Sequence, residues 1–184
     1  MAEYSPNFGY DPSLAEFATS KRSYFAAHPD APFDYVATSA LVVDTRTTSS
    51  PRILLLQRAA SDSDPNQWEP AGGACDDDDK SILHARAREL WEEAGLQAAQ
   101  IIGLVGDPHL FTLDNGKAVC QFNFALRVTM KGEPPLPVKL NPEEHQRFVW
   151  ATEGEVKTKK VNGMYLDFTR EEVGRTVVLA FSYF

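Results

Sequence analysis

The segment around residues 81–94 constrains the fold more than any other part of this 184-residue chain. On a helical wheel, at about 100° per residue, four apolar residues form one narrow stripe: Leu83, Ala87, Leu90 and Ala94. Such a stripe is typical of a helix that rests on a core. Gly95 follows, with Leu96 behind it, which matches a glycine cap and its hydrophobic contact. We therefore predict an amphipathic helix that ends at Gly95.

The far side of this predicted helix carries three glutamates, spaced three and four residues apart: Glu89, Glu92 and Glu93. Like charges at this spacing repel each other, and Arg88 lies four residues before Glu92, where it can form an ion pair. A hard divalent cation such as Mg²⁺ would remove the repulsion, because it takes oxygen ligands and shares them with substrate phosphates. A charged helix face is more commonly just solvated. The spacing alone leaves both interpretations open.

The remaining pattern predicts a mixed sheet covered by helices. We expect strands at residues 35–44, 52–58, 99–105, 108–113, 119–130 and 147–150. The continuous apolar run 53–56 indicates burial on both faces, and Asp114-Asn115-Gly116 predicts a hairpin turn. A final helix is expected from Thr169, as its cap, toward Phe181.

The first 33 residues are punctuated by prolines and contain one short helical candidate. We expect that helix at residues 13–27, capped by Ser13. The segment is interpreted as an arm that packs on the main domain or mediates pairing between copies, so a homodimer is left open.

Composition narrows the classes of partner. The net charge is −8 and no block of Lys or Arg stands out, which argues against a stable nucleic-acid partner. Cys75 and Cys120 do not define a disulfide framework, and no secretory signal is evident at the N-terminus. The apolar runs are too short to span a bilayer. These features favour a cytoplasmic protein without a membrane partner.

Residues 88–96 match a known pattern. The Nudix family is identified by a box of the form G-x5-E-x7-R-E-U-x-E-E-x-G-U, where U is bulky and aliphatic. Arg88-Glu89-Leu90-Trp91-Glu92-Glu93-Ala94-Gly95-Leu96 resembles its last nine positions without exception. Upstream, Gly72-Gly73 resembles the glycine pair of the box, and Trp68-Glu69-Pro70-Ala71 resembles the segment that leads into it.

The middle of the box departs from the family pattern. Standard spacing places Lys80 where the family has glutamate, and Ala74 where it has glycine. An insertion of one residue repairs the match, so that Gly73 is followed by five residues and then Asp79. Asp79 would then replace the first glutamate of the box, with Asp78 as the alternative.

The resemblance extends beyond the box. Leu54-Leu55-Leu56-Gln57-Arg58 is similar to the family strand that precedes it, and residues 142–150 are similar to a later Glu-His segment with its tryptophan. The resemblance therefore covers residues 34–184 as one Nudix hydrolase domain. It implies an α+β fold, a Nudix-like α/β/α sandwich whose mixed sheet carries the box helix and a C-terminal helix.

The resemblance also implies roles for individual residues. Mg²⁺, or Mn²⁺ in its place, would be held by Glu89, Glu92, Glu93 and a backbone carbonyl near Gly72, while Arg88 would orient a neighbouring glutamate. The general base varies in this family between a box glutamate and a later one, so the catalytic set is Glu92, Glu93, Arg88 and Glu144, with Glu143 as the alternative to Glu144. Arg58, Trp68 and Phe111 are candidates for substrate binding, although aromatic residues in strands are more often core. His109, His145 and Cys75 are kept out of the catalytic set.

The implied function is a metal-dependent pyrophosphohydrolase that cleaves a diphosphate linkage in a nucleoside diphosphate derivative or a related small diphosphate. A catalytically silent domain that binds a nucleotide or a partner is the first alternative. The second is an isoprenoid diphosphate-processing enzyme, although the expected cysteine is missing from residues 38–43. Selectivity among diphosphates is expected to depend on loops 59–67 and 132–142.

Overall fold

The computed structural model describes residues 4, 7–46, 50–130 and 136–184. The helices are η1 Pro12–Phe17, α1 Lys21–Ala27, α2 Ile82–Ala94, α3 Glu153–Lys157, α4 Glu171–Ala180 and η2 Phe181–Tyr183. The strands are β1 Gly9–Tyr10, β2 Tyr35–Asp44, β3 Arg52–Arg58, β4 Trp68–Glu69, β5 Ala71–Ala74, β6 Ala98–Leu104, β7 His109–Thr112, β8 Ala118–Val128, β9 His145–Thr152, β10 Lys160–Val161 and β11 Met164–Tyr165.

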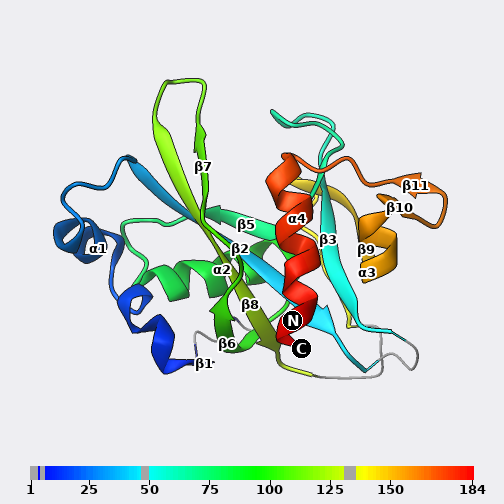
Figure 1. The fold of residues 1–184 in the computed structure, drawn as a ribbon, viewed down its shortest axis with the longest axis horizontal. Coiled ribbons are helices and arrows are strands. Elements are labelled where there is room, and N and C mark those ends of the chain that lie inside the picture. Colours follow the sequence, from blue (N-terminus) through cyan, green and yellow to red (C-terminus); the bar gives the residue numbers. More distant parts are fainter. Residues whose placement is uncertain (1–3, 5–6, 47–49, 131–135) are drawn as a thin grey trace.

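A mixed sheet lies at the centre of the molecule, with helices on both sides (Figure 1). Its main path runs β1-β6-β8-β2-β3-β4, and β5, β7 and β9 pair with β2, β8 and β3. The pairs β2–β8 and β1–β6 are parallel and the other pairs are antiparallel. The predicted α+β architecture is therefore confirmed.

Successive side chains of the central strands point to opposite faces of the sheet and pack in two separate cores. Leu54 and Leu56 of β3 pack in the core that α2 covers, whereas Ile53 and Leu55 pack in the core that α4 covers. All four are at most 1% exposed, so the predicted burial of this run on both faces is confirmed. The two helices thus lie on opposite faces of the central strands, as a layered sandwich requires.

Helix α2 is bounded as the sequence predicts. The Ser81 side chain accepts a hydrogen bond from the His84 N–H at 3.1 Å, which satisfies a free donor in the first turn. Gly95 ends the helix in the left-handed region at φ 66°, where its N–H donates to the Trp91 carbonyl at 2.9 Å. The hairpin turn before β8 is also confirmed, with Gly116 at φ 79°.

Two predicted helices differ from the structure. The N-terminal segment forms η1 and α1 instead of one helix, because Asp11 and Ser20 each cap a short helix and the chain breaks between them. Helix α4 begins at Glu171 after Arg170, which makes no side-chain capping bond, so Thr169 is not the cap. The Thr169 hydroxyl is buried, with no hydrogen-bond partner among the described residues.

The N-terminal segment packs against the rest of the chain. Leu14, Phe17 and Tyr24 are buried in the same core as α2, and β1 extends the sheet through β6. None of the helices in the described part of the chain combines the length and apolar character needed to cross a membrane.

Candidate active site

The glycine pair of β5 lets the sheet approach α2 closely. A Cβ atom on Gly72 would lie 2.6 Å from the Thr38 carbonyl oxygen of β2, and one on Gly73 would lie 2.6 Å from the carboxyl carbon of Glu89. Both distances are shorter than carbon–oxygen or carbon–carbon contacts allow. Only glycine at these two positions therefore leaves room for strand pairing on one side and for the Glu89 carboxylate on the other.

Glu93 is the buried carboxylate of this region. Its side chain lies at the interface of α2 and β5, and the residue is only 3% exposed. One carboxylate oxygen accepts a hydrogen bond from the Gly72 N–H at 2.7 Å. Desolvation raises the pKa of Glu93 well above its ordinary value, Arg86 opposes this effect, and the nearby charge of Glu89 adds to it.

Arg86 is a fully buried cation on the sheet side of α2. Its Nη1 donates to the Thr38 carbonyl at 3.0 Å, whereas Nε and Nη2 have no hydrogen-bond partner in the described part of the chain. Burial lowers its pKa, and the charges of Glu93 and Glu89 act in the opposite direction. Arg86 is thus the internal counter-charge for the two glutamates. Its role could not be read from the sequence, because an arginine two residues before Arg88 resembles an ordinary surface cation.

Arg88 connects the lengthened loop to the glutamates of α2. Its Nε and Nη2 donate to the two oxygens of Asp79 at 3.0 and 2.8 Å. Its Nη1 donates to Glu89 at 2.9 Å and to Glu92 at 2.8 Å. Of the two candidate aspartates, Asp79 is mostly buried and bonded to Arg88, whereas Asp78 is exposed. Arg88 Nη2 also forms an ion pair with Asp76 at 3.3 Å and donates to the Ala74 carbonyl at 3.2 Å.

The three box glutamates differ in exposure, so their side of α2 is not the merely solvated face that the sequence left open as an alternative. The Glu92 side chain is 49% exposed and that of Glu89 only 12%, while Glu93 is buried. A helical wheel could not predict this difference in exposure, because the difference results from the close approach of the glycine pair to one side of α2.

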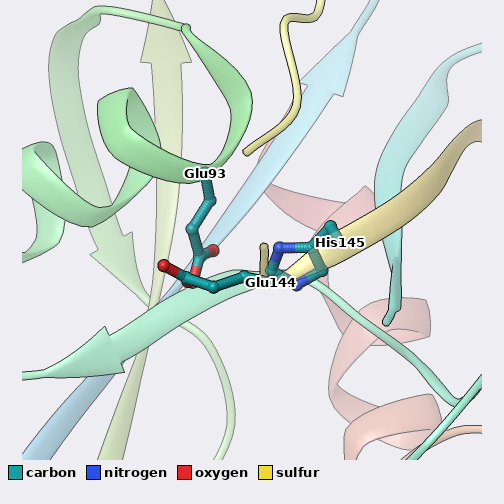
Figure 2. A group of neighbouring side chains, drawn as sticks. All are labelled: Glu93, Glu144 and His145. Carbon is teal, nitrogen blue, oxygen red and sulfur yellow. The ribbon is translucent and has the colours of Figure 1, made fainter. Parts of the chain in front are cut away.

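Glu144 and His145 meet Glu93 across the space between α2 and the start of β9. Figure 2 shows the Glu93 side chain pointing from α2 toward the Glu144 carboxylate, with the His145 ring beside them. One ligand atom from each of the three lies within 4.8 Å of the others. Glu144 also accepts a hydrogen bond from the Asn141 amide at 2.8 Å. Glu144 was predicted here, whereas His145 had been set aside.

These residues fit a divalent cation. The carboxylates of Glu93 and Glu144 lie close together, and Glu93 is buried. Burying an anion costs free energy unless the anion is paired or coordinates a metal. Both ring nitrogens of His145 are buried without a hydrogen-bond partner among the described residues. Carboxylate oxygens suit Mg²⁺ and Mn²⁺, and imidazole suits softer divalent ions.

A cavity of about 370 Å³ opens beside the glycine pair, within the size range of small-molecule sites. Phe111 lines it, and the Arg170 guanidinium lies 4.1 Å from the centre of the Phe111 ring. Arg58 also lines it and is held by Glu69 at 2.5 Å and by Asp62 at 2.6 Å. The structure thus brings two of the three predicted substrate-binding residues, Arg58 and Phe111, to one cavity.

Trp68, the third, lies elsewhere. It is 1% exposed and packs in the core beneath α4, where its backbone N–H donates to the Asp167 carbonyl at 2.7 Å. A fully buried ring has no face to offer a ligand, so Trp68 belongs to the core. Its place in the motif could not distinguish these roles, because strand aromatics serve both.

Two further residues of the cavity were missed. Glu69 orients Arg58, and Arg170 donates to the Gln121 side chain at 3.2 Å. Glu69 was noted only as part of a motif, and Arg170 lies far from the box in sequence. Their local sequence does not identify them as cavity residues, because only the folded sheet brings these distant segments together.

Comparison with known proteins agrees with this geometry. The NUDIX domain family model matches residues 35–171, so the chain belongs to the Nudix family. The search found no significant relative among curated proteins. Membership of this family supports, at a general level, a hydrolase of phosphoric anhydrides.

Several solved structures share the fold. A MutT protein from Methanosarcina mazei Go1 is 23% identical, with a TM-score of 0.56, over 80% of this chain and 92% of that one. A C. elegans Ap4A hydrolase in a binary complex is 20% identical, with a TM-score of 0.60, over 81% and 96%. The NUDIX domain of Shewanella oneidensis NrtR, complexed with ADP ribose, is 15% identical, with a TM-score of 0.58, over 86% and 96%.

Proposed function

We propose that this protein hydrolyses a diphosphate linkage in a nucleoside diphosphate derivative or a related small diphosphate. One observation carries the proposal: the buried Glu93 carboxylate, held by the Gly72 N–H, faces Glu144 and His145 within 4.8 Å. The 370 Å³ cavity opens at the same glycine pair. A bridging cation would let an acidic protein bind an anionic substrate, and the convergence of the Glu93 and Glu144 carboxylates supports such a site here.

Glu89, Glu92, Glu93 and the Gly72 carbonyl are the proposed ligands of Mg²⁺ or Mn²⁺. When bound, the metal lowers the pKa of a coordinated water and neutralises charge on phosphate oxygens. Arg88 keeps Glu89 and Glu92 oriented through its shared Nη1 contacts.

Glu144 is the proposed base that takes the proton of the attacking water. Its side chain is exposed to the site, and its contact with Asn141 holds it near Glu93. Glu143 lies beside it in sequence, where its backbone N–H donates to the Asn141 side chain at 3.2 Å. The described cluster includes Glu144 and not Glu143, which favours Glu144 over Glu143.

Arg58 and the stacked pair of Phe111 and Arg170 are proposed to bind the rest of the substrate. The two arginines bring guanidinium donors to the cavity, and the aromatic ring supplies an apolar surface. A phosphate-bearing compound with a planar group matches this combination.

The cysteines do not favour the isoprenoid alternative. Burial raises the pKa of Cys75 to about 12 and that of Cys120 to about 11, so both thiols stay protonated at neutral pH. A protonated thiol is a poor nucleophile.

The direct test is a phosphate-release screen over a library of nucleoside and isoprenoid diphosphates with Mg²⁺ or Mn²⁺. The wild type should turn over at least one nucleoside diphosphate derivative. Glu93→Gln should lose roughly 1,000-fold in turnover, since metal ligation supplies several kcal/mol of transition-state stabilisation. Glu153→Gln removes a partly exposed carboxylate from α3 and should retain full activity.

Two results would overturn the proposal. Tight binding of one compound without turnover would identify a silent binding domain instead. Full activity in Glu93→Gln would show that the ligands lie elsewhere. Glu144→Gln and Glu143→Gln, run as a pair, test the base: only the first should lose about 100-fold or more.

A further inference from the structure

The N-terminal segment contacts the lengthened box loop, residues 74–80, directly. The Lys21 ammonium of α1 donates to the Cys75 carbonyl at 2.8 Å and forms an ion pair with Asp77 at 2.8 Å. The Ile82 N–H, in the first turn of α2, donates to the Thr19 carbonyl at 3.0 Å. Figure 1 shows α1 beside the loop that leads into α2. Residues 1–34 lie outside the matched family range, so these contacts are additions to it.

From this loop a chain of contacts runs to the proposed metal ligands. The Asp76 N–H donates to the Asp79 carboxylate at 2.8 Å, which closes the loop on itself. Asp79 then accepts two hydrogen bonds from Arg88, and Arg88 donates to both Glu89 and Glu92. Asp79, together with the Ala74 carbonyl and Asp76 of the same loop, therefore positions Arg88, and through Arg88 the loop orients two glutamates.

The carbonyl contact is the stronger of the two that Lys21 makes. The Asp77 side chain is 91% exposed, and an ion pair to such a group contributes little. The Lys21 side chain is only 18% exposed, and its bond to the Cys75 carbonyl joins positions 54 residues apart. A hydrogen bond from a charged donor in this setting contributes more than an exposed ion pair.

We propose that Lys21 is a positioning residue of the site: it anchors the lengthened box loop through the Cys75 carbonyl, so that Asp79 can hold Arg88 and the glutamates in place. The extra loop residue gives the loop more freedom than the family spacing allows. The N-terminal segment removes that freedom by fixing the loop at Cys75 and the helix start at Ile82. The inference rests on the proposed function only for its Mn²⁺ readout, because that readout needs the proposed metal site.

The test compares Lys21→Met with Arg22→Met, which removes the same charge from an exposed neighbouring position on α1. Hydrogen exchange of the loop amides and Mn²⁺ binding, followed by electron paramagnetic resonance, are measured on the full chain. Lys21→Met should exchange the amides of residues 75–80 faster and bind Mn²⁺ about 10-fold more weakly. Arg22→Met should behave as wild type in both measurements. Asp77→Asn should also stay close to wild type, because the carbonyl contact remains.

Lys21→Arg provides the second variant, because arginine keeps a charged donor within reach of the carbonyl. It should restore slow exchange and most of the Mn²⁺ affinity, even if Lys21→Met folds poorly. The proposal is overturned if Lys21→Met matches Arg22→Met in loop exchange, or if Lys21→Arg is as impaired as Lys21→Met. Loop exchange needs neither metal nor turnover, so failure of the proposed function would appear separately, as a wild type without hydrolysis.

Discussion

At the scale of single residues, Gly73 determines how closely Glu89 approaches the sheet. A Cβ at this position would fall 2.6–2.7 Å from the carboxyl group of Glu89. The obstructing atoms are the end of a flexible side chain, so the substitution displaces the carboxylate and leaves the backbone in place. The substitution should therefore disturb metal binding and leave the stability of the fold nearly unchanged.

Gly73→Ala should weaken Mn²⁺ binding about 10-fold or more, while the midpoint of thermal unfolding changes little. Gly154→Ala is the matched control, because a Cβ there would meet no atom within 4 Å. Gly154 lies in α3, so alanine should stabilise the protein by roughly 0.5–1 kcal/mol and leave metal binding unchanged. Calorimetric titration together with thermal unfolding measures both. A Gly73→Ala protein with wild-type metal affinity would contradict this assignment of Glu89.

Arg86 and Glu93 form a second residue-scale pair, buried together beneath the site. Arg86→Met leaves Glu93 without its internal counter-charge and should destabilise the metal-free protein by about 3–5 kcal/mol at pH 8. Adding Glu93→Gln should recover part of this loss, since the uncompensated charge is then gone. Urea unfolding of the four proteins of the cycle gives the coupling energy. A coupling near zero would mean that the two charges do not stabilise each other.

At the scale of elements, β7 and α4 meet through a buried histidine. His109 Nε2 lies 2.9 Å from the Thr176 hydroxyl, and the residue is 5% exposed. Burial, followed by the nearby charge of Arg170, lowers the pKa of His109. The fold therefore favours the neutral ring, whereas the unfolded chain protonates at the ordinary value of about 6.5.

The sign of the pH effect follows from this lowered pKa. The contribution of His109 to stability is complete above about pH 6.5 and is lost as the pH falls through the lower folded-state pKa. From pH 7.5 to 5.5 the wild type should thus lose more free energy of unfolding than His109→Gln, which keeps a group near Thr176 but does not titrate. Urea unfolding at several pH values checks this. Parallel pH curves for the two proteins would contradict it.

Element boundaries were predictable where a local signal sets them. Ser81 and Gly95 each make their capping bond within one turn, and the hairpin before β8 depends on its own glycine. The break between η1 and α1 was missed, because Asp11 and Ser20 compete as caps with the Ser13 chosen from the sequence. The cap of α4 was also missed, since Thr169 instead donates its backbone N–H to the Trp68 carbonyl of the adjacent strand β4.

At the scale of the whole molecule, the architecture could be predicted and the finer arrangement of the site could not. The apolar run 53–56 and the apolar stripe of α2 predict a sheet with helices on its faces. A strand that is buried on both faces needs other elements packed against each face. The burial of Glu93, the core position of Trp68 and the position of His145 beside Glu93 depend on contacts between distant segments. The periodic pattern of apolar residues along one segment cannot predict such contacts.

Metal should also stabilise the whole chain. An ion that binds the folded protein and not the unfolded chain raises the free energy of unfolding, by about 2.7 kcal/mol at 100 times its dissociation constant. The wild type should therefore unfold at a higher temperature with Mg²⁺ or Mn²⁺ than with a chelator. Glu93→Gln should lose most of that difference. An equal shift in both proteins would indicate binding outside the site.

We expect Glu89, Glu92 and Glu93 to hold a divalent cation beside Glu144, and a Mn²⁺ titration followed by electron paramagnetic resonance is the sharpest check of that expectation. Wild type, Glu93→Gln and the control Glu153→Gln are titrated under one set of conditions. We expect saturable binding in the wild type and the control, and an affinity at least about 10-fold weaker in Glu93→Gln. Equal Mn²⁺ affinity in all three proteins would contradict it.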